Sequence, residues 1–213
     1  MSTTIAGIQI PDSQLTRQAT ELVRDTETAL LYHHSRRVFL FGALTGKKRE
    51  LLFDPELLYI GAMFHDMGLM PGYSSATERF EVDGANASRE FLRRHGIAEA
   101  SIDIVWDAIA LHTTPGIPQH KKAEVALVTA GVEMDVLGLG FPTVSEADRQ
   151  LVVDAHPRSP QFKEDIVEAF YQGIKHKPDT TFGNVKSDVM ALKHPHFHRT
   201  NFCSVIQNSA WPS

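Results

Sequence analysis

Apolar residues recur every three or four positions along most of the chain, and the alternation typical of β-strands is nearly absent. Asp54-Pro55 combines a capping acid with a proline for the first turn, and Gly46 is expected to end the helix before it. The pattern predicts helices over about residues 12–29, 28–45, 54–68, 82–95, 99–112, 121–137, 146–154, 161–174, 183–192 and 202–208.

The connections between these helices are short, and we find no internal repeat, low-complexity segment or linker. We therefore expect all 213 residues to form an all-α, single-domain helical bundle. A core that carries the motifs described below would cover about residues 28–140. Residues 155–213 are richer in proline and histidine and would form a C-terminal extension packed on that core.

Four polar residues interrupt apolar segments of different predicted helices. His34 falls on an apolar helix face, His65 and Asp66 interrupt the run GAMFHDMGL, and Asp135 lies in a helix that otherwise reads as buried. A lone histidine in such a place is often a core residue bonded to a carbonyl, but buried charges are paired or bind metal. Two imidazoles and two carboxylates form a mixed donor set that suits Zn²⁺, Fe²⁺ or Mn²⁺ better than Ca²⁺.

The pattern His34…His65-Asp66…Asp135 resembles the H…HD…D signature of the HD-domain superfamily of metal-dependent hydrolases. The surrounding words HSRRV, LLYIGAMFHDMGL and GVEMDVLG match as well, and the resemblance covers about residues 30–140. It implies an α-helical bundle in which these four residues hold one divalent ion, with Zn²⁺ expected first and Fe²⁺ or Mn²⁺ as alternatives. The word HSRRVFLFG is similar to the cyanamide-hydratase-like branch of the superfamily.

One departure from the family pattern concerns the number of metal ions. Two-metal members carry two further histidines between the HD pair and the last aspartate. His112 fits the later position, but the segment 81–84 contains Asp83 and no histidine, so we expect a single ion. His112 is then free to carry a proton or to bind the substrate, although a helix-end histidine that meets the helix dipole is an equal alternative.

Charge and composition narrow the classes of partner. The net charge is −5 and no basic block occurs, which argues against nucleic acid. The chain shows no signal-peptide pattern and no apolar run near the roughly 20 residues of a membrane span, so no membrane partner is expected. A single cysteine allows no intramolecular disulfide, which suits the cytoplasm. We expect a small-molecule substrate, and a homo-oligomer is compatible with the sequence.

Several other residues have ordinary interpretations. The histidine cluster at 194–198 is expected to be a surface loop, and Cys203 a buried inert thiol. His33 is expected either at the surface or behind the metal ligands, where it would support them without touching the ion. Arg36 and Arg37 would either form ion pairs within the bundle or steer an anionic substrate.

Three functions follow from these residues and the resemblance. The first is a metal-dependent hydrolase or hydratase in which Asp66 and His112 are catalytic and metal-bound water attacks a small molecule, as in hydration of cyanamide to urea. The second is a phosphohydrolase acting on a nucleotide or phosphate ester, helped by Arg36, Arg37 or Lys121 and Lys122. The third is a non-catalytic metal-binding domain with a closed coordination sphere.

Overall fold

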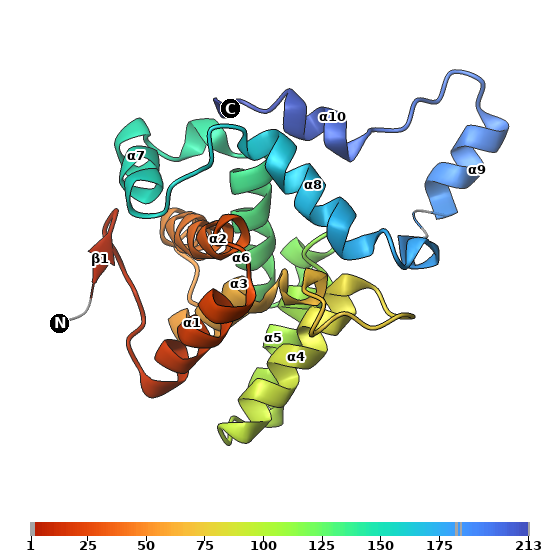
Figure 1. Cartoon of the computed structure of the whole chain (residues 1–213). Coiled ribbons are helices and arrows are strands. Elements are labelled where there is room, and N and C mark those ends of the chain that lie inside the picture. Colours follow the sequence, from red (N-terminus) through yellow and green to blue (C-terminus); the bar gives the residue numbers. More distant parts are fainter. Residues whose placement is uncertain (1–2, 182, 184, 213) are drawn as a thin grey trace.

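The computed structural model describes residues 3–181, 183 and 185–212, and helices form nearly all of its regular structure (Figure 1). The β-structure in this part of the chain is one antiparallel pair, β1 (Thr4–Ile5) and β2 (Ile8–Gln9). The α-helices are α1 (Gln14–Thr26), α2 (Ala29–Lys48), α3 (Pro55–Phe64), α4 (Phe80–Arg94), α5 (Glu99–Ala110), α6 (Ala123–Val132), α7 (Glu146–Ala155), α8 (Phe162–Ile174), α9 (Val185–Lys193) and α10 (Phe202–Gln207). The predicted all-α class is confirmed.

Short helical turns connect several of these helices. Four of them are 3₁₀ turns: η1 (Met67–Leu69), η2 (Pro118–His120), η4 (Phe141–Thr143) and η5 (Pro178–Thr181). The fifth, η3 (Glu133–Leu137), is a π-helical turn that continues α6 directly. Such wide turns are rare and often lie at functional sites.

Helices α2, α3 and α6 form the centre of the bundle. Thr28 caps α2 by accepting a hydrogen bond from the Leu31 N–H, and Asp54 caps α3. Glycines let α2 and α6 approach each other closely. A Cβ added at Gly131 would lie 2.2 Å from the carbonyl oxygen of Val38, which no side chain tolerates. This close approach places residues near the start of α2 beside the end of α6.

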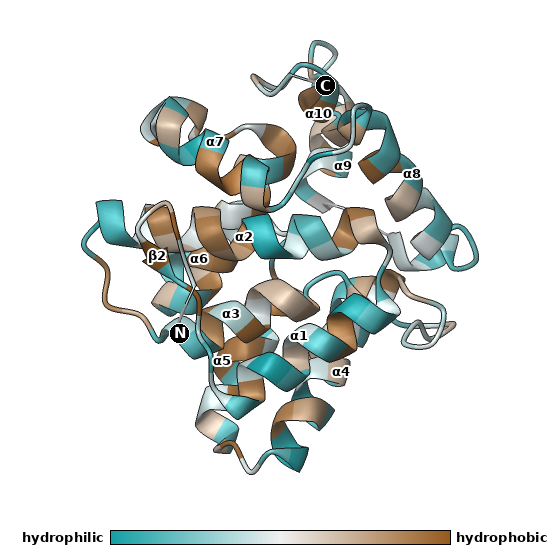
Figure 2. Ribbon diagram, turned by 60° about the vertical axis from the view of Figure 1, so that its left-hand side comes forward, coloured by the Kyte–Doolittle hydropathy of each residue, from teal (hydrophilic) through white to brown (hydrophobic). Residues whose placement is uncertain are grey.

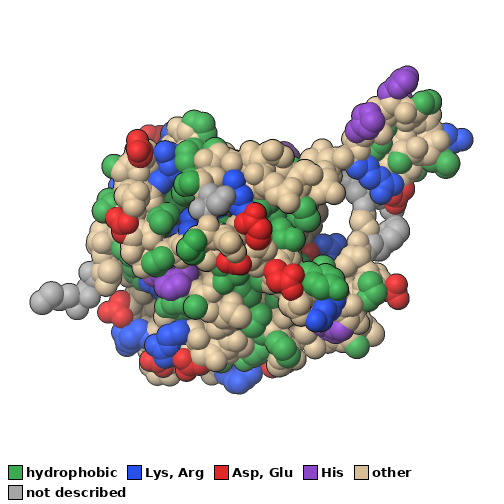
Figure 3. Space-filling model, turned by 45° about the horizontal axis from the view of Figure 1, so that its top comes forward, with side chains coloured by type: hydrophobic (Ala, Val, Ile, Leu, Met, Phe, Trp, Pro, Cys, Tyr) green, Lys and Arg blue, Asp and Glu red, His purple; other side chains and the backbone are tan. Residues whose placement is uncertain are grey.

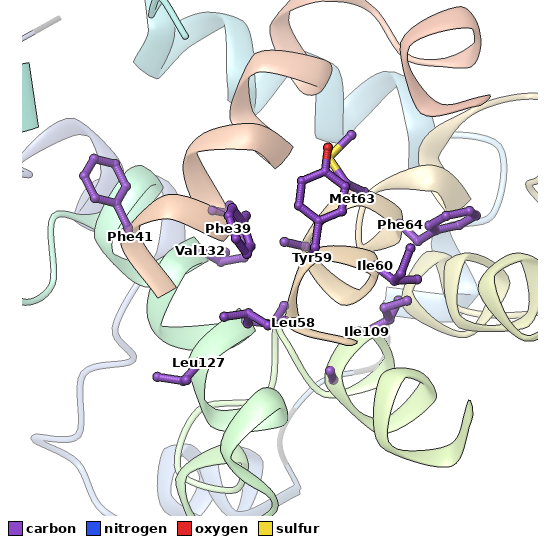
Figure 4. Packing of buried hydrophobic residues seen from close by; sticks show 14 of the residues in the cluster. Phe39, Phe41, Leu58, Tyr59, Ile60, Met63, Phe64, Ile109, Leu127 and Val132 are labelled. Atoms are coloured by element: carbon purple, nitrogen blue, oxygen red, sulfur yellow. The ribbon is translucent and has the colours of Figure 1, made fainter. Parts of the chain in front are cut away.

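The hydrophobic core surrounds α3. Its residues Leu58, Ile60, Met63 and Phe64 are fully buried, and Figure 4 shows them between Phe39 of α2 and the neighbouring helices. Figure 2 shows hydrophobic stretches on α5 and α6, whereas α1 carries mostly polar or weakly hydrophobic residues. The helices that carry the motif residues are therefore held in a rigid, closely packed core.

The C-terminal part of the chain lies partly on this core and partly away from it. Helices α7 and α8 pack over α2, and Trp211 returns to the body, where its Nε1–H donates to the carbonyl of Met134 at 2.6 Å. Helix α9 stands at the end of an arm in Figures 1 and 3, with Leu192 79% exposed. No helix in the described residues is long and apolar enough to cross a membrane.

Some predicted boundaries are wrong for physical reasons. Gly46 does not end α2, which continues to Lys48; this glycine is buried, and an added Cβ would meet the ring of Phe53 at 2.6 Å. The helix predicted over 54–68 ends at Phe64. The predicted start of the helix over 183–192 includes residue 184, which lies outside the described residues.

Two further differences concern the ends of the chain. The β1–β2 pair was not predicted, because two-residue strands are too short to produce a visible alternation. Cys203 is exposed rather than buried, because α10 is a six-residue helix that turns only part of its surface toward the body.

Candidate metal centre

Four of the predicted site residues meet in the interior. His34 comes from α2, His65 and Asp66 from the turn between α3 and η1, and His112 from the segment just after α5. None of these residues is more than 3% exposed. Residues that are 78 positions apart in the sequence, His34 and His112, thus contribute to one buried cluster.

The donor atoms of three residues are spaced like ligands of one ion. The Nε2 atoms of His34 and His65 are 3.1 Å apart, and Asp66 Oδ2 lies 3.3 Å from His65 Nε2 and 3.7 Å from His34 Nε2. Bonds of about 2.0–2.1 Å to a central Zn²⁺ would place neighbouring ligands roughly 3.0–3.4 Å apart. The three residues therefore form a group that could hold a metal ion.

Hydrogen bonds on the far side of each ring orient the histidines. The Nδ1–H groups of His65 and His112 donate to the carbonyls of Ala62 and Ile109, at 2.7 and 2.6 Å. His34 Nδ1 donates to Asp135 Oδ2 at 2.6 Å. In neutral rings, these bonds leave the Nε2 lone pairs of all three histidines facing the same space, as metal ligation requires.

Burial keeps two of these rings neutral. It lowers the pKa of His65 to about 3, with a further contribution from the nearby His34 ring. Burial likewise lowers the pKa of His112 to about 4, helped by His65. At neutral pH both side chains are consequently unprotonated bases rather than imidazolium ions.

Asp66 supplies the strongest indication of a cation. Both of its carboxylate oxygens are buried, and neither has a hydrogen-bond partner. Burial raises the pKa of Asp66, because an isolated buried carboxylate is costly. A divalent ion held by His34, His65 and Asp66 would remove this cost, so the chemistry of the residues present fits such an ion.

The local backbone explains how neighbouring residues can serve one site. His65 and Asp66 follow the last residue of α3, and Asp66 has φ −102° and ψ 0°, outside the regular helix. Gly68 then allows α4 to pack against the turn, since an added Cβ would lie 1.9 Å from the carbonyl oxygen of Phe80. The end of α3 thereby directs both side chains inward.

Asp135 occupies a different environment from that predicted. It lies on η3, and its Oδ1 and Oδ2 accept two hydrogen bonds from Arg37, at 2.8 and 2.9 Å. Arg158 adds a third at 2.9 Å, and His34 a fourth. Burial raises the pKa of Asp135, but the two guanidinium groups and His34 outweigh it and hold that pKa well below its ordinary value.

The carboxylate of Asp135 is therefore saturated and is not among the three donors that could share an ion. The geometry gives it the task of holding His34 in the orientation that presents Nε2. Its role as a fourth ligand remains a prediction.

The residues at the expected second metal position are used otherwise. Asp83 accepts hydrogen bonds from the buried ammonium of Lys177, at 2.7 Å, and from the Ser75 N–H. His112 Nε2 lies 3.9 Å from Asp66 Oδ1 and has no hydrogen-bond partner. Asp83 is therefore engaged by Lys177 and Ser75, and the expectation of a single ion stays a prediction.

Sequence reasoning missed three charged residues around the centre. Arg158 lies in the proline-rich extension, where no helical pattern marks it. Glu27 is buried; its Oε2 accepts a hydrogen bond from the Ser35 hydroxyl at 3.3 Å, whereas its Oε1 has no partner. Burial first and Asp66 second raise the pKa of Glu27 well above the usual value. Glu81 is buried beside Arg79, Thr113 and His112. Glu27 directly precedes Thr28, the N-cap residue of α2, and an acid at such a position is too common for the sequence to single it out.

Comparison with protein families agrees with this geometry. The family model of the HD domain matches residues 31–138, which is half of the chain and includes His34, His65, Asp66 and Asp135. The chain belongs to the HD-domain family. A search of curated proteins finds no match to this chain.

The HD-domain superfamily consists generally of metal-dependent hydrolases, and the His34, His65 and Asp66 cluster of this HD domain is compatible with that chemistry. The segment beyond the matched region covers the centre. The ring of Phe162, on α8, lies 6.1 Å from the His34 ring, and the Arg37 and Arg158 guanidinium groups stack on Phe162.

Proposed function

We propose that this HD domain is a hydrolase or hydratase that acts on a small uncharged molecule, with a nitrile such as cyanamide as the first candidate and urea as its product. The observation that carries the proposal is the pair of unpartnered buried groups, the Asp66 carboxylate and His112 Nε2, beside two oriented histidines. Unpaired polar groups of this kind are costly and mark sites that are completed by an ion and a reactant.

The ligand set favours catalysis over a structural role. His34, His65 and Asp66 would provide three protein ligands, whereas structural zinc sites usually have four and favour cysteine. When bound, a divalent ion lowers the pKa of a coordinated water to about 7 in the case of Zn²⁺ and so supplies hydroxide near neutral pH. Two histidines and one carboxylate also suit Fe²⁺, so the ion is proposed as Zn²⁺ first and Fe²⁺ or Mn²⁺ second.

The remaining residues would manage protons. Asp66 Oδ1 points toward His112 Nε2 and is free to accept a proton from water. His112 is held by its Nδ1–H on the Ile109 carbonyl and presents a neutral Nε2 that can take up a proton and return it to the product. The aromatic rings of Phe80 and Phe162 would exclude bulk water around this step.

The cations that a phosphate substrate would need are mostly engaged elsewhere. Arg37 is fully buried and bonded to Asp135 and to the carbonyls of His156 and Pro157. Arg36 donates to His156 and Tyr59, and Lys121 pairs with Asp107. These contacts favour an uncharged substrate.

One observation supports the alternative of a phosphohydrolase. The Nε and Nη2 groups of Arg158 are buried and have no hydrogen-bond partner, while its Nη1 holds Asp135. This unused edge of a guanidinium matches the two-oxygen geometry of a phosphate. A phosphate ester is therefore the second candidate substrate.

A product screen separates these functions. Zinc-loaded and iron-loaded protein would be incubated with cyanamide, small nitriles and nucleoside monophosphates, with the His65→Ala variant as control. Release of urea or ammonia supports the first candidate, and release of orthophosphate supports the second. Metal-loaded protein that releases none of these products would contradict both and favour a non-catalytic metal-binding domain.

A further inference from the structure

A groove of about 610 Å³ lies outside the metal centre and shares no lining residue with His34, His65, Asp66 or His112. It is formed by the end of α2, by η3, and by the segment from η4 to the start of α7. Its volume is that of ordinary small-molecule sites, which range over about 300–1,000 Å³. The proposed reaction gives this groove no role.

The lining of the groove combines an apolar floor with a basic rim. Leu44, Met134 and Val144 supply apolar surface. Lys47, Lys48 and Arg49 follow one another at the end of α2, and all three are exposed. Such a combination suits an organic anion, whose body packs on the floor while its charged group meets the rim.

Two of the three cations are available to a ligand. Lys48 Nζ is bonded to the carbonyl of Thr143 at 2.7 Å. Within the described residues, the side chains of Lys47 and Arg49 make no hydrogen bond or ion pair. The rim therefore offers free donors at Lys47 and Arg49.

The acids of the groove limit the charge of its ligand. Glu133 and Asp148 also line it, so two carboxylates face three cations. Glu133 lies half-buried at the floor of the groove. A polyanion would be repelled by these acids, whereas a single carboxylate would complete the charge balance.

The floor of the groove is continuous with the metal centre. Glu133 and Met134 line the groove, and the next residue on the same π-helical turn, Asp135, holds His34. The carbonyl of Met134 accepts the Trp211 Nε1–H, and the Trp211 ring stacks with Arg158. A ligand on the floor would thus contact η3. The next side chain on that turn, Asp135, orients His34, which is a proposed metal ligand.

We propose that this groove binds a small organic acid with one carboxylate and an apolar body, and that its occupancy changes the affinity of the metal centre through η3. The proposal does not depend on the reaction or on its substrate. Coupling between two such sites is reciprocal, so a metal at the centre would change the affinity for the acid by the same factor.

Trp211 provides the reporter for binding. Trp106→Phe leaves Trp211 as the single tryptophan, since the chain has two. Phenylacetate titrated into this protein should produce a saturable fluorescence change. Acetate, which lacks the apolar body, and benzyl alcohol, which lacks the carboxylate, should each bind at least about 10-fold more weakly. Lys47→Ala/Arg49→Ala should weaken phenylacetate binding by about 10-fold, whereas the matched surface variant Lys122→Ala/Arg94→Ala should not.

A second measurement tests the coupling. Zinc affinity, measured by competition with a chelating dye, should change by at least about 3-fold when phenylacetate saturates the groove, and in Lys47→Ala/Arg49→Ala the change should require about 10-fold more phenylacetate. Absence of saturable binding, or equal affinity in the Lys47 and Arg49 variant, would overturn the site. Binding that leaves zinc affinity unchanged would overturn the connection through η3.

Discussion

Two buried aspartates of the centre, Asp66 and Asp135, have opposite surroundings. Both are fully buried. Asp135 receives hydrogen bonds from Arg37, Arg158 and His34, and its pKa is lowered below the usual range. Asp66 receives none, and burial raises its pKa. The protein thus stabilises the carboxylate of Asp135 with hydrogen bonds and ion pairs, and it leaves the carboxylate of Asp66 without a partner.

This contrast separates two functions that the sequence pattern combines. A carboxylate saturated by arginines is an anchor, because its charge is already neutralised and its position is fixed. A carboxylate without partners needs a cation from outside the chain, because the protein provides none. We therefore propose Asp66 as a metal ligand and Asp135 as the residue that orients His34.

The largest expected effect is on zinc binding by Asp66→Asn. Removal of a charged ligand should lower zinc affinity by more than about 1,000-fold, while the metal-free protein should gain stability, since a buried unpartnered carboxylate costs about 1–3 kcal/mol. Zinc titration and urea unfolding of metal-free protein measure the two effects. Retained zinc affinity, or a less stable metal-free variant, would show that Asp66 already has a partner.

The Arg37→Met variant tests the anchor. It leaves the Asp135 carboxylate buried with one arginine fewer, and removal of one partner of a buried ion pair typically costs about 3–5 kcal/mol. Urea unfolding should reveal the loss. Arg24→Met, which removes an exposed arginine from its pair with Asp25, should leave the unfolding free energy unchanged. Equal effects of the two variants would contradict the anchoring role.

Asp135→Asn sharpens the difference between ligand and orienting residue. Loss of a partner that orients a ligand histidine usually lowers metal affinity by about 10- to 100-fold. The zinc affinity of Asp135→Asn should therefore fall much less than that of Asp66→Asn, at equal folded content by circular dichroism. Equal losses in the two variants would identify Asp135 as a fourth ligand instead.

The smallest effect concerns Glu27, another buried carboxyl that lacks a cation. Its folded-state pKa lies well above the unfolded value, so the folded protein binds the extra proton. Stability from this group is therefore lost as pH rises from about 4.5 toward the raised pKa. Glu27→Gln removes this dependence, so in metal-free protein its melting temperature relative to wild type should increase as pH rises. A difference that is constant with pH would contradict the raised pKa.

The sequence was sufficient for the helices and for the residues of the HD pattern. Their positions follow from apolar spacing and from the local chemistry of a helix end at His65 and Asp66. It was insufficient for the partners of those residues. From the sequence, Arg37 could equally form an ion pair within the bundle or steer an anionic substrate. Arg158 reaches Asp135 only because the extension folds back over α2. Contacts between distant segments decide which acid is an anchor, and no spacing along the chain contains that information.

The change from α-helix to π-helix at Glu133 was likewise invisible in the pattern. The residues 121–137 read as one continuous helix, but the wider turn is what directs Asp135 toward Arg37 and His34 while Glu133 and Met134 line the groove. A single predicted helix therefore serves two separate sites.

A crystal structure of the zinc-loaded protein, with anomalous diffraction recorded at the zinc edge, tests the central claim most directly. We expect one zinc ion about 2.0–2.2 Å from the Nε2 atoms of His34 and His65 and from an oxygen of Asp66, with Asp135 still bonded to Arg37 and Arg158. A zinc-soaked crystal with no ion between these three side chains would contradict the account.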